Sequence, residues 1–492
     1  MITVLDTEEA CPQDSDKFFH LSFIYLLMNR IFTLGVILKM LMLIVFYFSN
    51  IGSNSTKNNS MHRVLRSEQI QPIPQRIDNG YSDLEDFEYL ESGIAYMMGK
   101  YDIKGASIAV VNDGKLVFAK GLGYADTESK EPVEPKHLFR IASVSKLITA
   151  ITIMKMTELD LIGIDDKVFG KNGILNDSIY LDYADPRVED ITIRHLLNHS
   201  SGWNRDYDHN MGMHHIISRN LQIDKNNVGM SDILLYALKK RLHFAPGSRT
   251  GYSNLGYGIL GEIIEAVTGT DYEIYVKQTI LLPLGIHEMR LGKNHLENRF
   301  ENEVKYYKTA YIPDNISLYP EHRESPVAYG GNDLESLAAA GGWIASPAEI
   351  LKLVVAIDSI PEADKILSRE SIKMMTDREL SGGHTIGWAK ADKLGNWWRT
   401  GTLSGTSALV KRQQDGISWA VFFNSSTYMG INLPNEINHE VHTALEKVNN
   451  WPAHDLFYQF ATTPYLYPDI AQLRLNKKWE KTPHGNFSMH EE

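Results

Sequence analysis

The chain has 492 residues, of which 43% are hydrophobic and 22% are charged, a composition typical of folded globular proteins. This length leaves room for one large domain with extensions or for several domains. The formal charge of −12 argues against nucleic acid as a partner, because proteins that bind polyanions are usually basic. The single cysteine, Cys11, excludes a disulfide framework and a cysteine-based zinc site.

Residues 1–49 are expected to form a signal peptide or a membrane anchor. Their clearest apolar part, residues 31–49, has about the length that crosses a bilayer. If the segment is a signal peptide, Met28 is the true start and leads into a short charged n-region. A buried helix of a soluble protein is the third interpretation. We expect the folded body to be exported, to the periplasm or outside the cell, and to contact a membrane only if residues 31–49 stay attached.

Residues 50–80 are rich in Asn, Ser and Pro, which predicts a solvated linker. The folded body is expected over residues 81–448. The sequence from Ser82 to Glu85 has the pattern of a capping box, and apolar residues at helical spacing follow it. It therefore predicts the first helix of the body.

Strand patterns occur at both ends of the expected body. Near its start, two runs of β-type residues flank Asp113-Gly114 and predict a hairpin. Near its end, three runs predict strands, with a turn at Asp415-Gly416, and a helix with one apolar face follows. The runs are residues 106–111, 116–124, 397–401, 407–412 and 417–424, and the helix covers 434–448.

Helical patterns fill the middle of the chain. Residues 143–159 are apolar on nearly every side, which predicts a helix that is buried all round. This distribution predicts an α+β fold: an antiparallel sheet flanked by helices, formed by residues 81–158 and 340–448, with a mainly helical part inserted over 159–339. Residues 449–492 are taken as a C-terminal extension.

An S-x-x-K sequence, from Ser143 to Lys146, opens the apolar helix. Serine is a weak nucleophile that needs an adjacent base, and a lysine three residues later lies on the same helix face. At a helix N-terminus, Ser143 also lies where backbone N–H groups and the helix dipole favour a developing anion. Lys146 acts as a base only if burial or a nearby cation lowers its pKa. The apolar helix is the candidate source of the burial, and Arg399 is the candidate cation.

Two further motifs follow in order along the chain. The first is the Y-x-N sequence from Tyr252 to Asn254, and the second is the R-T-G sequence from Arg399 to Gly401. Tyr252 is a second candidate proton carrier, because a phenol close to cations ionises more easily. Arg399 is permanently charged and can bind a substrate carboxylate through two hydrogen bonds.

The three motifs together resemble those of the serine β-lactamase and penicillin-binding protein superfamily, in the branch whose second motif is Tyr-x-Asn. This branch includes class C β-lactamases, carboxylesterases of β-lactamase fold and D-aminopeptidases. Longer segments resemble the family too, and the resemblance covers roughly residues 80–448. These segments are FRIASVSK at 139–146, RHLLNHSSG at 194–202, FAPG at 244–247, YSNLGYG at 252–258 and GGWIAS at 341–346.

The resemblance implies a β-lactamase/transpeptidase-like fold and an acyl-serine intermediate on Ser143, with Lys146 and Tyr252 sharing the proton transfers. It implies that the backbone N–H groups of Ser143 and Thr402 form the oxyanion hole. The substrate-binding residues that it implies are Asn254, Arg399, Thr400, Gly401 and Thr402. Arg399 departs from the Lys or His that is usual at its position, which leaves the choice of substrate open.

We therefore expect a serine hydrolase that needs neither metal nor cofactor. The expected partners are small-molecule or peptide acyl substrates: β-lactams, esters, or small peptides and amides. Two alternatives stay open: a membrane-tethered binding or scaffold protein that has lost turnover, which Arg399 motivates, and a D-Ala carboxypeptidase-type penicillin-binding protein. His199 is expected to structure its loop rather than to act as a base.

Overall fold

The computed structural model describes residues 77–204, 214–224, 228–308, 325–358, 366–426 and 433–457, and two short strands beyond them. The contacts divide the chain after residue 70, and all described residues belong to the second unit, residues 71–492. The predicted segment 31–49 lies outside the described residues. Among the described residues, no helix is both long enough and apolar enough to cross a membrane.

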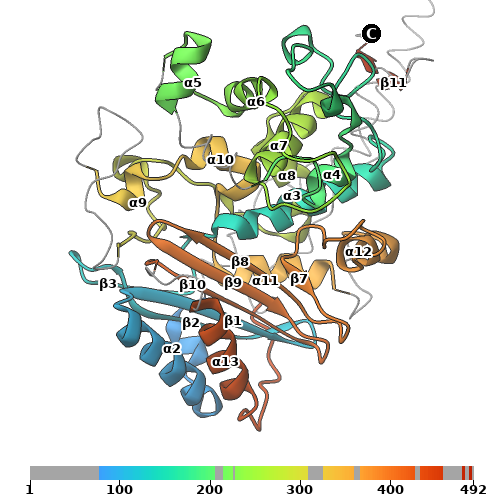
Figure 1. The fold of residues 1–492 in the computed structure, drawn as a ribbon. Coiled ribbons are helices and arrows are strands. Elements are labelled where there is room, and N and C mark those ends of the chain that lie inside the picture. Colours follow the sequence, from blue (N-terminus) through green and yellow to red (C-terminus); the bar gives the residue numbers. More distant parts are fainter. Residues whose placement is uncertain are drawn as a thin grey trace, which may run out of the picture. The chain divides into compact units, whose positions relative to one another are not determined.

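The centre of the fold is an antiparallel sheet in the order β3-β2-β1-β10-β9-β8-β7 (Figure 1). The N-terminal strands meet the C-terminal strands where β1 pairs with β10, with Ala109 opposite Ala420. The predicted sheet, closed by the two ends of the body, is confirmed. Its strands are β1 Gly105–Asn112, β2 Lys115–Asp126, β3 Glu131–Pro132, β7 Lys390–Ala391, β8 Trp397–Leu403, β9 Thr406–Arg412 and β10 Ile417–Phe423.

The turn between β1 and β2 has the geometry that its sequence predicts. Asp113 and Gly114 both adopt positive φ, at 48° and 79°, and Asn112 pairs with Lys115 across them. Two positive φ values are what a type I′ hairpin turn requires. The turn between β9 and β10 also uses a glycine at positive φ, Gly416 at 88°.

The two faces of the sheet bury different side chains, because successive residues of a strand point to opposite faces. Ile108 and Val110 of β1 belong to one apolar cluster with residues of α2 Glu88–Tyr101 and α13 Leu433–Leu445. Ala109 and Val111 belong to the other cluster, which contains the remaining helices. Figure 1 shows α2 and α13 on one side of the sheet and α3, α7 and α11 on the other.

The elements described between residues 159 and 339 are helical apart from the short strand β5. The prediction of an α+β fold with a mainly helical insertion is therefore confirmed. A small second sheet in the order β4-β6-β5 joins Phe139–Arg140, Trp343–Ala345 and Arg290–Leu291. The helices are α3 Ser145–Glu158, α4 Ile193–Leu197, α5 His214–Leu221, α6 Met230–Leu238, α7 Asn254–Thr268, α8 Tyr272–Val276, α9 Val327–Gly330, α10 Leu334–Gly341, α11 Pro347–Ala356 and α12 Arg369–Thr376.

The capping box predicted at Ser82 is wrong. Ser82 is buried, and its hydroxyl accepts a hydrogen bond from the backbone N–H of Ala119 in β2 at 2.9 Å. The first helix, α2, begins only at Glu88, after two 3₁₀ turns. A neighbouring strand therefore uses the oxygen that the sequence pattern assigns to the helix N-terminus.

The start of the predicted C-terminal extension packs on the sheet. The backbone N–H of Leu456 donates to the carbonyl oxygen of Leu116 at 2.8 Å, and the N–H of Leu116 donates to Asp455 Oδ1 at 3.1 Å. Further on, β11 Trp479–Lys481 pairs with β12 Phe487–Met489. Residues up to Leu456 thus continue the body, although their sequence shows no period.

Candidate active site

The S-x-x-K serine lies in a tight turn between the small sheet and α3. Ser143 is the middle residue of a 3₁₀ turn, Ala142–Val144, that passes directly into α3. Ala142 is fully buried at a φ of 48°, a backbone region that residues other than glycine rarely adopt. Ser143 itself is only partly buried, between the buried residues Ala142 and Val144. The turn therefore leaves the serine accessible at the end of a buried helix.

The three residues predicted to be catalytic come together around this serine. Tyr252 OH lies 2.7 Å from Ser143 Oγ, and Lys146 Nζ lies 3.4 Å from the same atom. Ser143 lies in the turn before α3, Lys146 lies in the first turn of α3, and Tyr252 lies before α7, 109 positions after Ser143. The serine hydroxyl is therefore closer to the phenol than to the amine.

Lys146 is fully buried and surrounded by acceptors. Its Nζ donates to Asn254 Oδ1 at 2.6 Å, to the carbonyl oxygen of Ala340 at 2.5 Å and to Ser143 Oγ at 3.4 Å. An ammonium group has three donors and no acceptor, so these contacts suit the charged form of the lysine.

Tyr252 lies between two cations. Besides Ser143, its hydroxyl accepts from Arg399 Nη2 at 3.3 Å, and Lys146 Nζ lies 5.1 Å from the centre of its ring. Burial raises the pKa of Tyr252, but the charges of Lys146 and Arg399, with hydrogen bonds from Lys146 and Ser143, lower it by more. The phenol therefore loses its proton at a lower pH than an ordinary tyrosine.

Strand β8 passes directly beneath the nucleophile turn. Arg399 Nε donates to the carbonyl oxygen of Ser143 at 2.8 Å. Two residues later on the same strand face, a Cβ on Gly401 would lie 2.1 Å from the carbonyl oxygen of Ile141. Only glycine allows so close an approach. Thr400 is half-buried and Thr402 is exposed.

The Y-x-N motif is held by a helix cap. Ser253 is buried, and its hydroxyl accepts from the N–H of Gly256, which makes it the N-cap of α7. Ser N-caps are strongly preferred at helix starts. Tyr252 and Asn254 therefore flank a fixed cap, and Asn254 reaches Lys146 while Tyr252 reaches Ser143.

His199 supports this segment from the neighbouring loop. Its Nδ1 accepts from the backbone N–H of Ser253 at 3.3 Å, and its ring lies 4.7 Å from the ring of Tyr252. Burial, together with the charges of Arg399 and Lys146 and of His384, holds the pKa of His199 well below its usual value. A neutral, hydrogen-bonded imidazole agrees with the expected structural role.

A kink in α10 supplies an acceptor that the sequence analysis missed. Ala338 has φ 18° and ψ −96° inside this helix. The following carbonyl oxygens point toward α3: Ala339 O accepts from Thr149 Oγ1 at 2.6 Å, and Ala340 O accepts from Lys146. A backbone carbonyl has no residue type of its own, so the only sequence signal nearby is the Gly341-Gly342 pair that ends the helix.

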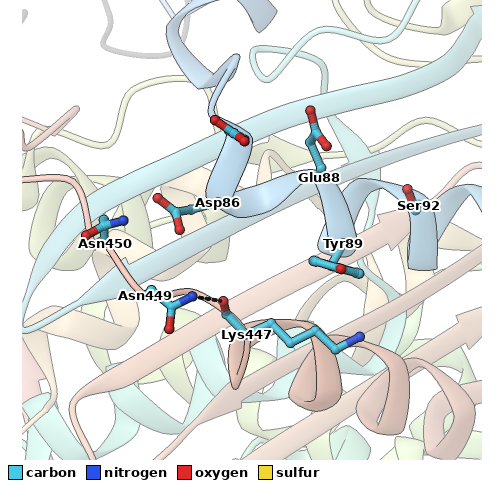
Figure 2. Close-up of a pocket in the computed structure, with 8 residues that line it drawn as sticks. Asp86, Glu88, Tyr89, Ser92, Lys447, Asn449 and Asn450 are labelled. Carbon is cyan, nitrogen blue, oxygen red and sulfur yellow. Dashed lines mark hydrogen bonds between the residues drawn. The ribbon is translucent and has the colours of Figure 1, made fainter.

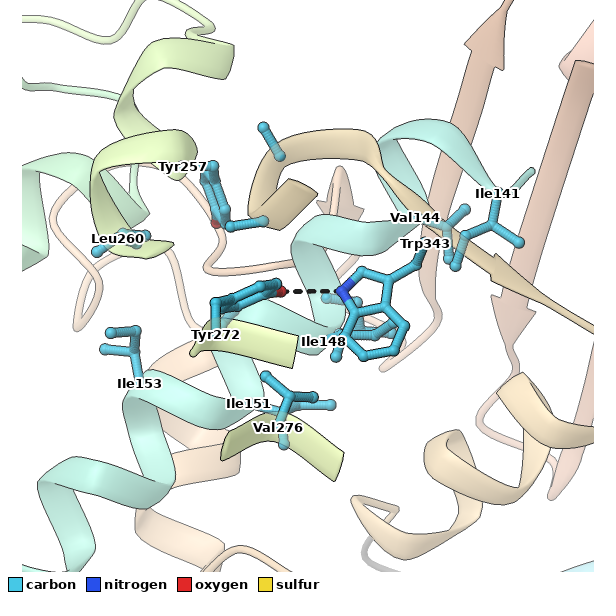
Figure 3. Packing of buried hydrophobic residues seen from close by; sticks show 14 of the residues in the cluster. Ile141, Val144, Ile148, Ile151, Ile153, Tyr257, Leu260, Tyr272, Val276 and Trp343 are labelled. Carbon is cyan, nitrogen blue, oxygen red and sulfur yellow. Dashed lines mark hydrogen bonds between the residues drawn. The ribbon is translucent and has the colours of Figure 1, made fainter. Parts of the chain in front are cut away.

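Hydrogen bonds between a tyrosine hydroxyl, an indole and a threonine hydroxyl stabilise the buried layer next to the site. Trp343 Nε1 donates to Tyr272 OH at 2.9 Å, and this hydroxyl also lies 2.7 Å from Thr149 Oγ1. Figure 3 shows this bond among apolar side chains that include Ile148 and Ile151 of α3. The predicted burial of the helix on all sides is confirmed.

A surface pocket of about 590 Å³ lies in the other layer of the fold. Figure 2 shows it between the first turn of α2 and the residues after α13. It contains no residue of the group around Ser143. Its lining consists of Glu85, Asp86, Glu88, Tyr89, Ser92, Lys447, Asn449 and Asn450.

Among the residues that the structure describes, no three His, Cys, Asp or Glu side chains gather in a group that could hold a metal ion. His214, from the histidine pair at 214–215, instead lies 2.9 Å from Asp333 Oδ2 in a buried pair.

The comparisons with known proteins agree with the motifs. The Beta-lactamase family model matches residues 90–438, which is more than half of the chain. "Penicillin-binding protein 4*" of Bacillus subtilis is 31% identical over 217 residues, 44% of this chain and 43% of the relative. "Protein flp" of Staphylococcus aureus is 32% identical over 260 residues, 51% of this chain and 47% of the relative. The chain thus spans less than half the length of these relatives.

Solved structures share the fold. The octameric penicillin-binding protein homologue from Pyrococcus abyssi is 27% identical, with a TM-score of 0.54, over 74% of this chain and 78% of that one. The D-amino acid amidase from Ochrobactrum anthropi SV3, complexed with L-phenylalanine amide, is 21% identical, with a TM-score of 0.56, over 74% of this chain and 97% of that one. The chain belongs to the β-lactamase family of serine hydrolases.

Proposed function

We propose that this protein is a serine hydrolase that works through an acyl intermediate on Ser143. The observation that carries the proposal is the hydroxyl of Tyr252, 2.7 Å from Ser143 Oγ and between two cations. A nucleophile in contact with a base that other groups orient is the arrangement that covalent catalysis needs.

In the proposed acylation step, Ser143 Oγ attacks the carbonyl carbon of the substrate and gives its proton to the Tyr252 phenolate. Lys146 stays an ammonium and favours the developing negative charge. The backbone N–H groups of Ser143 and Thr402 bind the oxyanion. As the tetrahedral intermediate collapses, the leaving group takes the proton from Tyr252.

Deacylation repeats these steps with water as the nucleophile. Tyr252 takes a proton from the water, the hydroxide attacks the acyl carbon, and the proton passes to Ser143 Oγ as the acid leaves. Asn254 keeps Lys146 in place and is the candidate partner of a substrate amide.

The proposed substrates are β-lactams, esters, or small peptides and amides. Relatives are named as penicillin-binding proteins and as a D-amino acid amidase. These names support an acyl donor with an amide bond, and the chemistry proposed for Ser143 extends to esters. They do not identify the leaving group of the substrate.

The test is mass spectrometry of the chain, both intact and after digestion to peptides, following incubation with penicillin or p-nitrophenyl butyrate. We expect one added acyl group on the peptide that contains Ser143, and none in Ser143→Ala. Equal labelling of Ser143→Ala at this peptide would overturn the proposal. An acyl group that never clears would indicate the binding protein without turnover, and release of D-Ala from a muropeptide would indicate the carboxypeptidase.

We also propose that the folded body is exported and that residues 31–49 direct it or hold it at a membrane. The support is the apolar length of this segment. Reporter fusions after residue 80 test this: a reporter active only outside the cytoplasm is expected, and one active only in the cytoplasm would contradict it.

A further inference from the structure

The guanidinium of Arg399 is already bound by the protein. Arg399 is 2% exposed. Its Nε donates to the Ser143 carbonyl oxygen at 2.8 Å, and its Nη2 donates to Tyr252 OH at 3.3 Å. Nε and one Nη form an edge of the planar fork that binds a carboxylate through two parallel hydrogen bonds. On Arg399, two protein groups occupy this edge.

The strand that carries Arg399 packs closely against the nucleophile turn. Arg399 and Gly401 lie on the same face of β8, because side chains alternate along a strand. Gly401 packs so closely that a Cβ there would lie 2.1 Å from the carbonyl oxygen of Ile141. The guanidinium also lies 5.7 Å from the centre of the Tyr252 ring. A substrate carboxylate would have to displace these contacts in order to bind the Nε–Nη2 edge, and because Arg399 is 2% exposed, little of the other edge, formed by Nη1 and Nη2, faces outward.

The second cation beside Ser143 is also bound by protein acceptors. Lys146 donates to the carbonyl oxygens of Asn254 and Ala340. Both charged side chains that hydrogen-bond to Ser143 are therefore held by neighbouring oxygens. Breaking hydrogen bonds between buried groups leaves unpaired polar atoms, which is unfavourable for each group.

Given the proposed acyl-serine function, on which this inference rests, we propose that Arg399 is a positioning residue and not a carboxylate anchor. It fixes the nucleophile turn and the hydroxyl of Tyr252. The site then selects acyl donors that have no carboxylate beside the scissile bond, namely neutral esters and amides. This differs from the expectation drawn from the sequence, in which Arg399 binds a substrate carboxylate.

A matched pair of substrates tests the proposal. S-(phenylacetyl)thioglycolate and its methyl ester differ only in the carboxylate, and thiol release reports the kcat/KM of both. We expect the methyl ester to be at least tenfold better. A free acid that is turned over as fast as the ester, or faster, would overturn the proposal.

Arg399→Ala separates positioning from recognition. If Arg399 is a positioning residue, kcat/KM falls by the same factor for both substrates, within about threefold. The acid limb of the pH profile also moves to higher pH, because a positive charge beside Tyr252 is lost. A carboxylate anchor predicts a loss confined to the free acid. Arg399→Lys keeps the charge and is expected to keep the pH limb near its original position.

Lys411→Ala is the matched control. Lys411 lies on the neighbouring strand β9 and donates to Asn438 Oδ1 of α13 at 2.7 Å, in the layer that does not hold Ser143. Its removal takes away one positive charge and is expected to leave the kcat/KM of both substrates and their pH profiles unchanged.

Two measurements keep this inference separate from the proposed function. If neither substrate adds an acyl group to Ser143, the proposed function fails. Equilibrium binding of S-(2-phenylethyl)thioglycolate and its methyl ester, in which a methylene replaces the scissile carbonyl, tests the carboxylate claim without turnover. The methyl ester is expected to bind at least as tightly, and tighter binding of the free acid would overturn the inference.

Discussion

The two sides of Ser143 each hold a buried cation, and the two cations meet different groups. On the side of α3 and α10, Lys146 is held by carbonyl oxygens from Asn254 and Ala340. On the side of β8, Arg399 donates to the nucleophile turn and to a phenol. Lys146 is thus held by two oxygens that do not titrate, whereas Arg399 is held by one such oxygen and by Tyr252, whose pKa the charges of both cations lower.

This difference assigns separate tasks to the two sides. Burying a charge is costly unless hydrogen bonds replace the lost water. Both Lys146 and Arg399 make such hydrogen bonds to protein oxygens. Tyr252 OH, the titrating hydroxyl 2.7 Å from Ser143 Oγ, is under the charge of both cations, whereas Arg399 also holds the carbonyl oxygen of Ser143. Variants that change one side and leave the other intact test this difference.

The largest expected effect comes from Tyr252→Phe. This change removes the hydroxyl that contacts Ser143 and keeps the ring, so kcat/KM is expected to fall by about a thousandfold, within the range typical of a general base. Hydrolysis of p-nitrophenyl butyrate measures it. Tyr257→Phe is the matched control: it removes a buried hydroxyl that donates to the Leu197 carbonyl oxygen, and a loss of less than tenfold is expected. A Tyr252→Phe variant that keeps activity within tenfold would contradict the assignment of the base.

Gly401→Ala tests the approach of β8 to the nucleophile turn. The added Cβ would lie 2.1 Å from a backbone oxygen, so the strand or the turn must move. We expect the free energy of unfolding to fall by about 3 kcal/mol, the upper end of the usual cost of overpacking. Urea unfolding followed by tryptophan fluorescence measures this, with Gly99→Ala, where a Cβ would meet nothing within 4 Å, as the control. Equal stability of the two variants would argue against the close contact.

Thr149→Val tests the side of α10. The substitution keeps the shape and removes the hydroxyl that donates to Ala339 O at 2.6 Å and contacts Tyr272 OH at 2.7 Å. Because buried polar groups lose their partner, the free energy of unfolding is expected to fall by about 1–3 kcal/mol. Chemical denaturation measures it. The pH profile is expected to keep its shape, because Lys146 keeps its bonds to Asn254 and Ala340. A shifted limb would show that the loss of the Thr149 hydroxyl moves Lys146, whose charge lowers the pKa of Tyr252.

The pH dependence of kcat/KM of the wild-type chain reports the ionisation of Tyr252. Burial raises the pKa of Tyr252, and the charges of Lys146 and Arg399 lower it by more. The phenolate fraction therefore grows as the pH rises through this lowered pKa, and kcat/KM is expected to rise with a midpoint below pH 10.0.

His199→Asn is the control for this profile. His199 has a φ of 61°, which Asn tolerates better than most residues, and the Asn carbonyl can still accept from the N–H of Ser253. The limb is expected to stay in place. Its disappearance in this variant would assign the titration to His199.

The sequence predicted those parts of the fold whose cause is local. The hairpin at Asp113-Gly114 follows from two residues that accept positive φ. The strands near the end of the body follow from alternation, and the burial of α3 follows from apolar residues on every side. Ser82 is the exception, because its oxygen is used by β2 and not by the following helix.

For the candidate site, the sequence alone determined which residue types are available: a serine with a lysine one turn later, a Tyr-x-Asn segment and a glycine two residues after Arg399. The tertiary structure decided which atoms meet. It brought Tyr252 to Ser143, turned the Ala340 carbonyl toward Lys146 and bound the guanidinium of Arg399 within the protein. The physical reason is that local propensity acts over a few residues, whereas contacts between distant segments, and above all those made by backbone oxygens, leave no pattern in the order of side chains.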